Sequence, residues 1–266
     1  MLSHLSPVIE IILSLTGILV IGSVFAIISN NTIDRIAKNQ PLTTPSPYCP
    51  ACAVTLQWKD MIPIVSYLIA KGKCPYCGAD IPRRNILIEI SEIIWVGLFI
   101  MKFGWNYPAL LEMLFGMCLI AIIVIEYERR VLSESLLLFM IMLSTIYVLA
   151  FNHTEFPRAI TSMIIGSSVL IIYNLLKIIT LKTKRIEFRE IKFGAVLGLF
   201  FGLPLIYLCI LLSWLIGAIW GSINIRFFRQ KPKYALPDYP FILAISALVM
   251  IMFGDNILAH YNRWIL

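Results

Sequence analysis

Apolar residues gather in eight long runs along this chain, and the predicted elements follow from those runs. The runs cover residues 8–28, 86–101, 109–125, 136–150, 159–181, 193–203, 205–225 and 241–257. Helices of about 20 apolar residues are long enough to cross a lipid bilayer. The run at 193–203 is short and ends before Pro204, so it predicts either a half-helix or the first part of the next helix. The pattern therefore predicts an all-α, polytopic membrane helix bundle with about eight transmembrane segments.

A single long polar stretch interrupts this pattern between the first and second runs. It divides the chain into a first transmembrane helix at 1–29, a polar insert at 30–85 and a membrane helix bundle at 86–266. Of the 266 residues, 59% are hydrophobic and only 14% are charged, which excludes a soluble globular domain. Composition alone would also suit a transporter or channel with a small polar module.

Positive charge alternates between successive connections. Most of the 22 lysines and arginines fall in the insert and in the connections that follow the third, fifth and seventh runs. Cytoplasmic loops are enriched in these residues, so both termini are expected outside, in the periplasm, and the insert in the cytoplasm. The net charge of +7 then reflects membrane topology and gives no reason to expect a nucleic-acid partner.

Two Cys-x2-Cys pairs in the insert predict a metal site. Cys49 and Cys52 form the first pair, and Cys74 and Cys77 form the second. This spacing is typical of a tetrahedral zinc site with four thiolates. The alternatives are two disulfides or four free thiols, and the cytoplasmic placement disfavours disulfides. A bound zinc ion would let so small an insert keep a fold that its apolar residues cannot hold alone.

Two acidic residues are candidates for chemistry because of where they lie. Glu126 directly follows the third run and Glu190 precedes the sixth, so both are expected at the cytoplasmic face. Two carboxylates at one depth could share a proton and activate water. The alternative is that both acids pair with adjacent arginines at helix ends. Glu89 and Glu92 share a helix face in the second run and could either neutralise the basic insert or join a site.

The insert and both ends of the chain resemble the type IV prepilin peptidase family. Gly22-Ser23 is similar to the opening motif of that family, and Pro240-Phe241 is similar to a segment near its C-terminus. The strongest similarity is an ordered series of insert residues: Cys49, Pro50, Cys52, Trp58, Asp60, Ile62, Pro63, Ser66, Tyr67, Lys71, Gly72, Lys73, Cys74, Cys77, Gly78, Ala79, Ile81, Arg84 and Glu89.

The resemblance implies a bifunctional enzyme of the bacterial inner membrane. Members cut the leader from prepilins and pseudopilins, then methylate the new N-terminus with S-adenosylmethionine. It implies prepilins or pseudopilins and pilus or type II secretion assembly proteins as partners, besides the lipid bilayer. It places Gly72, Lys73 and the zinc knuckles in the methyltransferase half, and Glu126, Glu190 and Lys192 at the peptidase positions.

The chain departs from the family at the peptidase motifs. Where the family has an aspartate followed by Pro-Asp, this chain has Glu126 followed by Ser133-Glu134. Where the family has Gly-x-Gly-Asp-x-Lys, residues 187–192 keep Lys192, lose both glycines and carry Glu190 in place of the aspartate.

These substitutions predict an impaired peptidase. Each glutamate has an extra methylene, and Arg189 lies beside Glu190 in the sequence, where a cation would favour the ionised carboxylate. The sequence therefore predicts a protein that binds prepilins or pseudopilins with weak or absent cleavage, a pseudoenzyme in the extreme case. The alternative is an active bifunctional enzyme that uses a Glu dyad.

Overall fold

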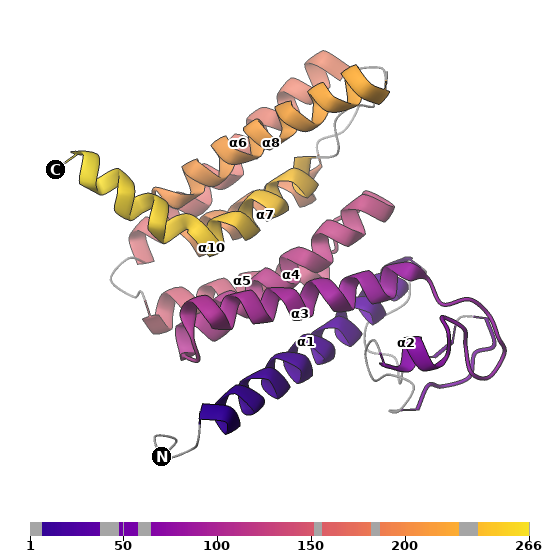
Figure 1. Ribbon diagram of the computed structural model, residues 1–266. Coiled ribbons are helices and arrows are strands. Elements are labelled where there is room, and N and C mark those ends of the chain that lie inside the picture. The colour runs from indigo at the N-terminus through magenta and orange to yellow at the C-terminus, as the bar shows by residue number, and fades with distance from the viewer. Residues whose placement is uncertain are drawn as a thin grey trace. The chain divides into compact units, whose positions relative to one another are not determined.

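The computed structural model describes residues 7–37, 48–49, 51–57, 65–151, 156–181, 187–228 and 239–265. These residues form eight long helices and one short helix, and the all-α prediction is confirmed (Figure 1). The helices are α1 (Pro7–Ala37), α2 (Val65–Ile69), α3 (Arg83–Phe103), α4 (Tyr107–Arg129), α5 (Glu134–Phe151), α6 (Phe156–Leu181), α7 (Phe188–Phe201), α8 (Leu205–Phe228) and α10 (Tyr239–Ile265). Each predicted apolar run coincides with one of the eight long helices.

Six of the helices, α1, α4, α5, α6, α8 and α10, are long and apolar enough to cross a membrane, which makes this a multi-pass membrane protein. Helix α3 has 21 residues but carries Glu89 and Glu92 within its apolar stretch. Helix α7 has 14 residues, which is about 21 Å at 1.5 Å per residue and shorter than the hydrocarbon core. Gly202, at φ 64°, ends α7, and α8 begins at Leu205, so the run at 193–203 forms a helix of its own.

The helices belong to two compact units, Met1–Ala109 and Leu110–Leu266. In the first unit, α1 packs against α3 (Figure 1). Gly22 permits this packing, because a Cβ atom at this position would lie 2.8 Å from the Cα of Ile93. Asp34 pairs with Arg84 near the end of α1 from which the insert leaves. The first unit is therefore a helical hairpin whose two arms lead into and out of the insert.

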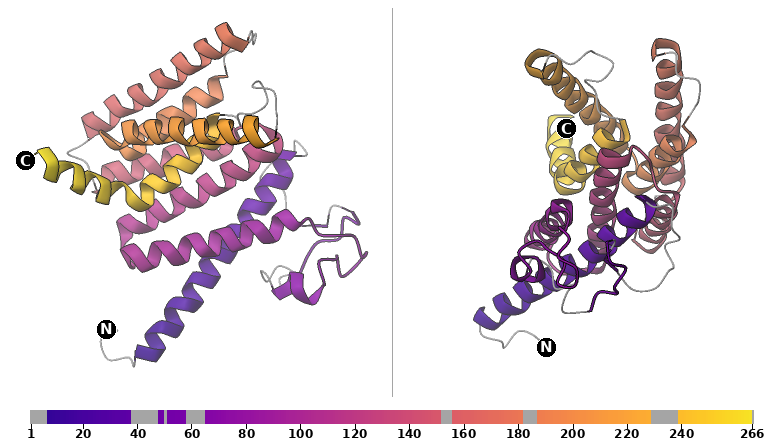
Figure 2. Two further views of the ribbon diagram at one scale, coloured as in Figure 1. Left: turned by 45° about the horizontal axis from the view of Figure 1, so that its top comes forward. Right: turned by 90° about the vertical axis from the view of Figure 1, so that its right-hand side faces the viewer.

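In the second unit, α7 packs against α6 and α5, and α8 packs against α10 (Figure 2). Helices α6 and α7 approach at backbone distance, since a Cβ on Gly194 would lie 2.5 Å from the carbonyl oxygen of Gly166. Small residues allow such close helix crossings within membranes, where apolar burial alone drives little association. The short α7 is thus held firmly by its neighbours.

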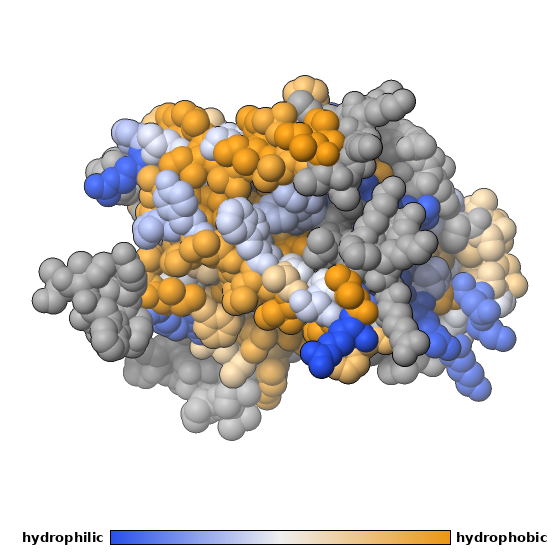
Figure 3. Space-filling view, turned by 90° about the horizontal axis from the view of Figure 1, so that it is seen from above, coloured by the Kyte–Doolittle hydropathy of each residue, from blue (hydrophilic) through white to orange (hydrophobic). Residues whose placement is uncertain are grey.

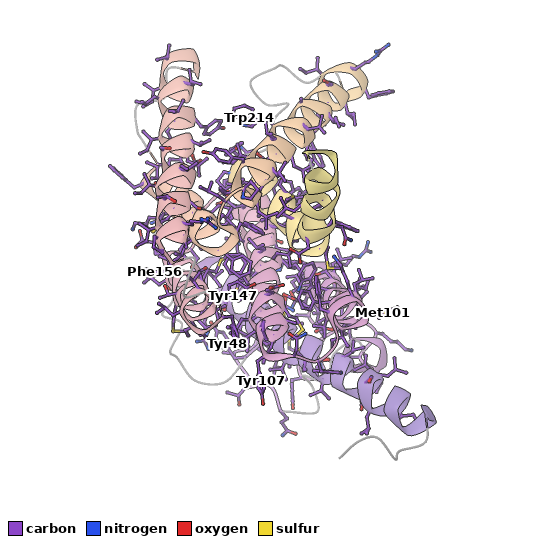
Figure 4. All side chains as sticks on the ribbon, turned by 90° about the vertical axis from the view of Figure 1, so that its left-hand side faces the viewer. Tyr48, Met101, Tyr107, Tyr147, Phe156 and Trp214 are labelled. Carbon is purple, nitrogen blue, oxygen red and sulfur yellow. The ribbon has the colours of Figure 1, made fainter. Side chains whose placement is uncertain are left out.

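The surface of the protein is rich in exposed apolar side chains, as expected for a chain that faces lipid (Figure 3). Trp214 on α8 is 57% exposed and Phe156 at the start of α6 is 36% exposed (Figure 4). Exposed apolar side chains of this kind suit contact with lipid tails.

Candidate functional sites

The four cysteines of the insert come together as the spacing predicts. Their sulfur atoms all lie within 4.8 Å of one another, and the Sγ atoms of Cys49 and Cys77 are 3.9 Å apart. A tetrahedral zinc ion with Zn–S bonds of about 2.3 Å holds its sulfur ligands about 3.8 Å apart. The cluster therefore fits a metal ion such as zinc. All six cysteines of the chain are free thiols, so the disulfide alternative is not what the structure shows.

The two knuckles are built alike, although their sequences differ. In the first, the backbone N–H of Cys49 donates to Val54 and that of Ala53 donates to Cys49. In the second, the N–H of Cys74 donates to Ala79 and that of Gly78 donates to Cys74. A bridge between Tyr48 and Thr55 closes the first turn, and one between Lys73 and Asp80 closes the second. Each Cys-x2-Cys pair is thus a local backbone turn that aims two sulfur atoms at one point.

The knuckles differ at the residue that follows the second cysteine. Both positions have left-handed backbone, with φ 58° at Ala53 and φ 72° at Gly78. Glycine adopts this conformation without cost, whereas a residue with a Cβ atom is strained there. The first knuckle therefore carries a strain that the second one avoids.

The sulfur atoms do not have equivalent acidities. Burial opposes ionisation of the Cys49 thiol, but backbone hydrogen bonds from Cys52 and Ala51 outweigh it and lower the pKa of Cys49 to about 7. At Cys77 the backbone of Ala79 favours the thiolate, yet desolvation and the neighbouring sulfur atoms raise its pKa to about 12. Cys49 is thus the thiol that ionises more readily, and Cys77 is the one that keeps its proton more firmly.

Gly72 and Lys73 lie directly before the second knuckle. Gly72 has φ 72°, and a Cβ atom there would lie 3.0 Å from the hydroxyl oxygen of Tyr67. Its carbonyl accepts a hydrogen bond of 2.8 Å from the N–H of Ile81. Lys73 is exposed. Gly72 therefore has a clear structural task in closing the turn, and the methyltransferase role of this pair stays a prediction.

Both predicted peptidase glutamates are buried. Glu126, near the end of α4, is 5% exposed, and Glu190, in the first turn of α7, is 2% exposed. Arg189 reaches from α7 to the carbonyl of Leu132 at 3.4 Å, so the first turn of α7 contacts the connection that follows α4. The two carboxylates thus occupy the same end of the second unit. That they meet around one water molecule stays a prediction.

The cationic residues next to Glu190 in the sequence, Arg189 and Lys192, form ion pairs with Glu134. The Nε atom of Arg189 is 3.6 Å from Glu134, and the Nζ atom of Lys192 is 3.4 Å from the same carboxylate. All three side chains are about half exposed. The sequence argument that Arg189 acts on Glu190 as a fixed cation is therefore weakened, since its ion pair is with Glu134.

Asn174 is a residue of this site that the sequence argument did not find. It lies on α6, is 1% exposed, and its Nδ2 atom donates to Glu190 Oε2 at 2.9 Å. The available signal was a lone asparagine in an apolar run, eight residues after Gly166, with a leucine between them at position 170. Such a residue marks the interior of a helix bundle.

The acids of α3 have different surroundings. Glu92 is fully buried in the first unit, and Ser29 of α1 donates to its Oε1 atom at 3.1 Å. Glu89 is partly buried. Glu92 therefore faces α1 rather than the basic insert.

Comparison with known proteins gives concordant results. Residues 20–103 match the model of the bacterial peptidase A24 N-terminal domain. The chain is 30% identical over 228 residues to the prepilin leader peptidase/N-methyltransferase of Pseudomonas aeruginosa, covering 84% of this chain and 77% of that one. It is 29% identical over 224 residues to the protein of that name from Stutzerimonas stutzeri, covering 84% and 77%.

The similarity extends to a relative from Bacillus subtilis. The prepilin leader peptidase/N-methyltransferase of Bacillus subtilis is 26% identical over 232 residues, which cover 86% of this chain and 90% of that one. No solved structure matches the chain.

Proposed function

Because the chain belongs to the prepilin leader peptidase/N-methyltransferase family, we propose that it binds prepilins or pseudopilins at the cytoplasmic membrane face and removes their leader slowly. Glu126 and Glu190 carry the cleavage in this proposal. They stand where the family has aspartates, by the sequence resemblance set out above.

The observation that carries the proposal is the burial of two carboxyl groups at one end of the second unit. Burying a carboxylate away from water costs several kcal/mol unless other groups compensate for it. A site that had lost its chemistry could replace either acid with an apolar residue and gain stability. Two retained carboxyl groups therefore support retained proton chemistry.

The proposed reaction needs one protonated and one ionised carboxyl group. The ionised group accepts a proton from a water molecule, whose oxygen attacks the carbonyl carbon of the scissile peptide bond. The protonated group donates its proton to the carbonyl oxygen of that bond. The tetrahedral intermediate then breaks its C–N bond. The group that took the water proton gives it to the leaving amine nitrogen, and the other, now ionised, group takes a proton from a hydroxyl of the intermediate, so one protonated and one ionised carboxyl group are restored.

The extra methylene in each glutamate is the reason to expect slow cleavage. A placement error of about 1 Å at the reacting atoms can cost on the order of 100-fold in rate. The ion pairs of Arg189 and Lys192 with Glu134 weaken one argument for complete loss, because each cation also serves another acid. Impaired cleavage is therefore favoured over none.

A prepilin cleavage assay with purified protein in detergent or nanodiscs tests this proposal. We expect a measurable cleavage product from the parent protein and a loss of at least about 100-fold in Glu126→Gln and in Glu190→Gln. Glu128→Gln is the matched control, because Glu128 is exposed on the same helix end as Glu126. A parent protein that binds prepilin but leaves it uncut would overturn the peptidase proposal and leave a prepilin-binding protein.

We also propose that Cys49, Cys52, Cys74 and Cys77 hold one zinc ion that fixes the fold of the insert. The fit of the four sulfur atoms supports this proposal. Elemental analysis is expected to find about one zinc per chain.

Methylation of the new N-terminus, with S-adenosylmethionine as donor, is the second candidate function. The family-model match over residues 20–103 supports it, because that segment contains the knuckles, Gly72 and Lys73. Labelled S-adenosylmethionine and a pre-cleaved pilin test it without any need for the peptidase. Absence of label on the pilin would contradict it.

A further inference from the structure

We propose that Asn174 is a positioning residue for Glu190, which fixes the direction of its carboxylate and so decides which oxygen carries the proton. The inference rests on the proposed function for its catalytic meaning. It deepens that function by assigning a task to a residue of α6 outside both acidic motifs.

The side-chain amide of Asn174 makes three hydrogen bonds. Its Nδ2 atom donates to Glu190 Oε2 at 2.9 Å and to the carbonyl of Leu170 at 3.0 Å. Its Oδ1 atom accepts from the backbone N–H of Glu187 at 3.1 Å. Glu187 is the residue that precedes the first turn of α7. One amide therefore ties α6 both to the start of α7 and to the carboxylate that α7 carries.

These contacts leave only one orientation for the amide. Rotation by 180° would bring Oδ1 against two acceptor oxygens and would bring Nδ2 against a backbone N–H donor. Each of those arrangements is repulsive, and a buried polar group that loses its hydrogen bond destabilises the fold. The amide therefore presents N–H to Glu190.

The backbones of α6 and α7 hold the amide and the carboxylate at this distance. Ser162, Gly166, Leu170 and Asn174 recur every four residues and share one face of α6. On α7, Gly198 packs on Ser162, Gly194 packs on Gly166 and Leu170, and Glu190 reaches Asn174. This α6–α7 ladder leaves no room for a larger side chain at its glycine positions, so the final pair is placed by rigid helices.

The consequence for Glu190 is an asymmetric carboxyl group. Oε2 accepts an N–H and cannot point a proton of its own at that donor. The N–H stabilises negative charge on Oε2 and so favours a proton on Oε1, which is then the atom that takes part in proton sharing. The amide also limits the rotamer freedom that the longer glutamate side chain would otherwise have.

The first experiment measures how the contact between Asn174 and Glu190 affects thermal stability, and it requires no catalysis. Asn174→Asp keeps the shape but replaces the N–H donor with a second buried carboxyl group. We expect its thermal midpoint in detergent to fall by roughly 5 °C. The exchange Asn174→Asp with Glu190→Gln places the amide on the other partner, and we expect it to recover most of that loss. Asn256→Asp is the control, because Asn256 is exposed on α10, and we expect no shift.

The second arm measures prepilin cleavage. In Asn174→Leu we expect kcat to fall on the order of 100-fold while KM stays within about twofold, because the reacting group is misaimed and the peptide site is intact. A purely structural asparagine would lower the yield of folded protein and leave kcat per folded molecule unchanged.

The two arms separate this inference from the function on which it rests. An unchanged midpoint in Asn174→Asp, or an exchange variant that recovers nothing, would overturn the positioning contact itself. A parent protein that cuts no prepilin would overturn the catalytic part together with the proposed function, even if the stability pattern were present. Equal kcat in the parent and Asn174→Leu would overturn the catalytic part alone.

Discussion

The four-cysteine cluster and the buried glutamates are assembled in different ways. Each cysteine pair is closed by backbone hydrogen bonds between residues four or five positions apart, and a metal ion would only have to join two finished turns. Glu126 and Glu190 are 64 residues apart in the sequence. Glu126 lies on α4 and Glu190 on α7, and α5 and α6 come between them along the chain. The placement of Glu190 depends on how α6 and α7 pack. The first site is formed by local turns and the second by the packing of the whole second unit. A substitution that disrupts one site is therefore expected to leave the other intact.

Metal removal should have the largest effect and should stay within the insert. Structural zinc sites contribute about 10–16 kcal/mol in small zinc modules. We therefore expect Cys49→Ser with Cys74→Ser to lose bound zinc almost completely and to unfold the insert. Hydrogen exchange should show the loss in residues 48–82 and leave α5 to α7 protected. Equal loss of protection in α7 would contradict the separation of the two sites.

Forcing helices α6 and α7 apart should impair prepilin cleavage and leave the zinc site of the insert intact. In Gly194→Val the new side chain meets the carbonyl of Gly166, so the helices must separate. We expect cleavage to fall at least about 100-fold while zinc content is unchanged. Gly97→Ala is the control, because a Cβ there finds its nearest neighbour at 3.7 Å. Loss of zinc in Gly194→Val would show that the two sites are coupled.

The sequence predicted the local site well because its cause is local. The spacing of Cys49, Cys52, Cys74 and Cys77 is sufficient to indicate a common point for four sulfur atoms. The eight helices followed similarly from runs of apolar residues. The packing of α6 against α7 could not be predicted this way, because small residues in an apolar helix do not indicate which other helix packs against them. The role of Asn174 depends on that packing. The pairing of Arg189 with Glu134 depends on the packing of α7 against α5, which the sequence does not specify either.

Relieving the backbone strain in the first knuckle should give a smaller effect, a gain in the stability of the insert. Ala53→Gly relieves a left-handed residue with a Cβ atom, and we expect it to stabilise the insert by about 1 kcal/mol. Gly78→Ala should destabilise the equivalent position of the second knuckle by a similar amount. The rate of zinc transfer to a chelator measures both, and it should fall in the first variant and rise in the second. A change of the zinc-transfer rate in the same direction in both variants would contradict the structural similarity of the two turns.

The exposed ion pairs around Glu134 should matter least. Pairs of half-exposed charges contribute about 0–1 kcal/mol. We expect Arg189→Gln to change the thermal midpoint by less than about 2 °C and the cleavage rate by less than about threefold. A large rise in cleavage would restore the view that Arg189 acts on Glu190 directly.

The most direct test of the account is reversion of the two glutamates in the intact protein. We expect that Glu126→Asp with Glu190→Asp, combined with Glu187→Gly and Arg189→Gly, cuts prepilin at least about 10-fold faster than the parent, with unchanged zinc content. The parent rate is measured beside it with the same prepilin and the same detergent. No cleavage by either protein, although both bind prepilin, would contradict the claim that a working dyad lies at this end of the second unit.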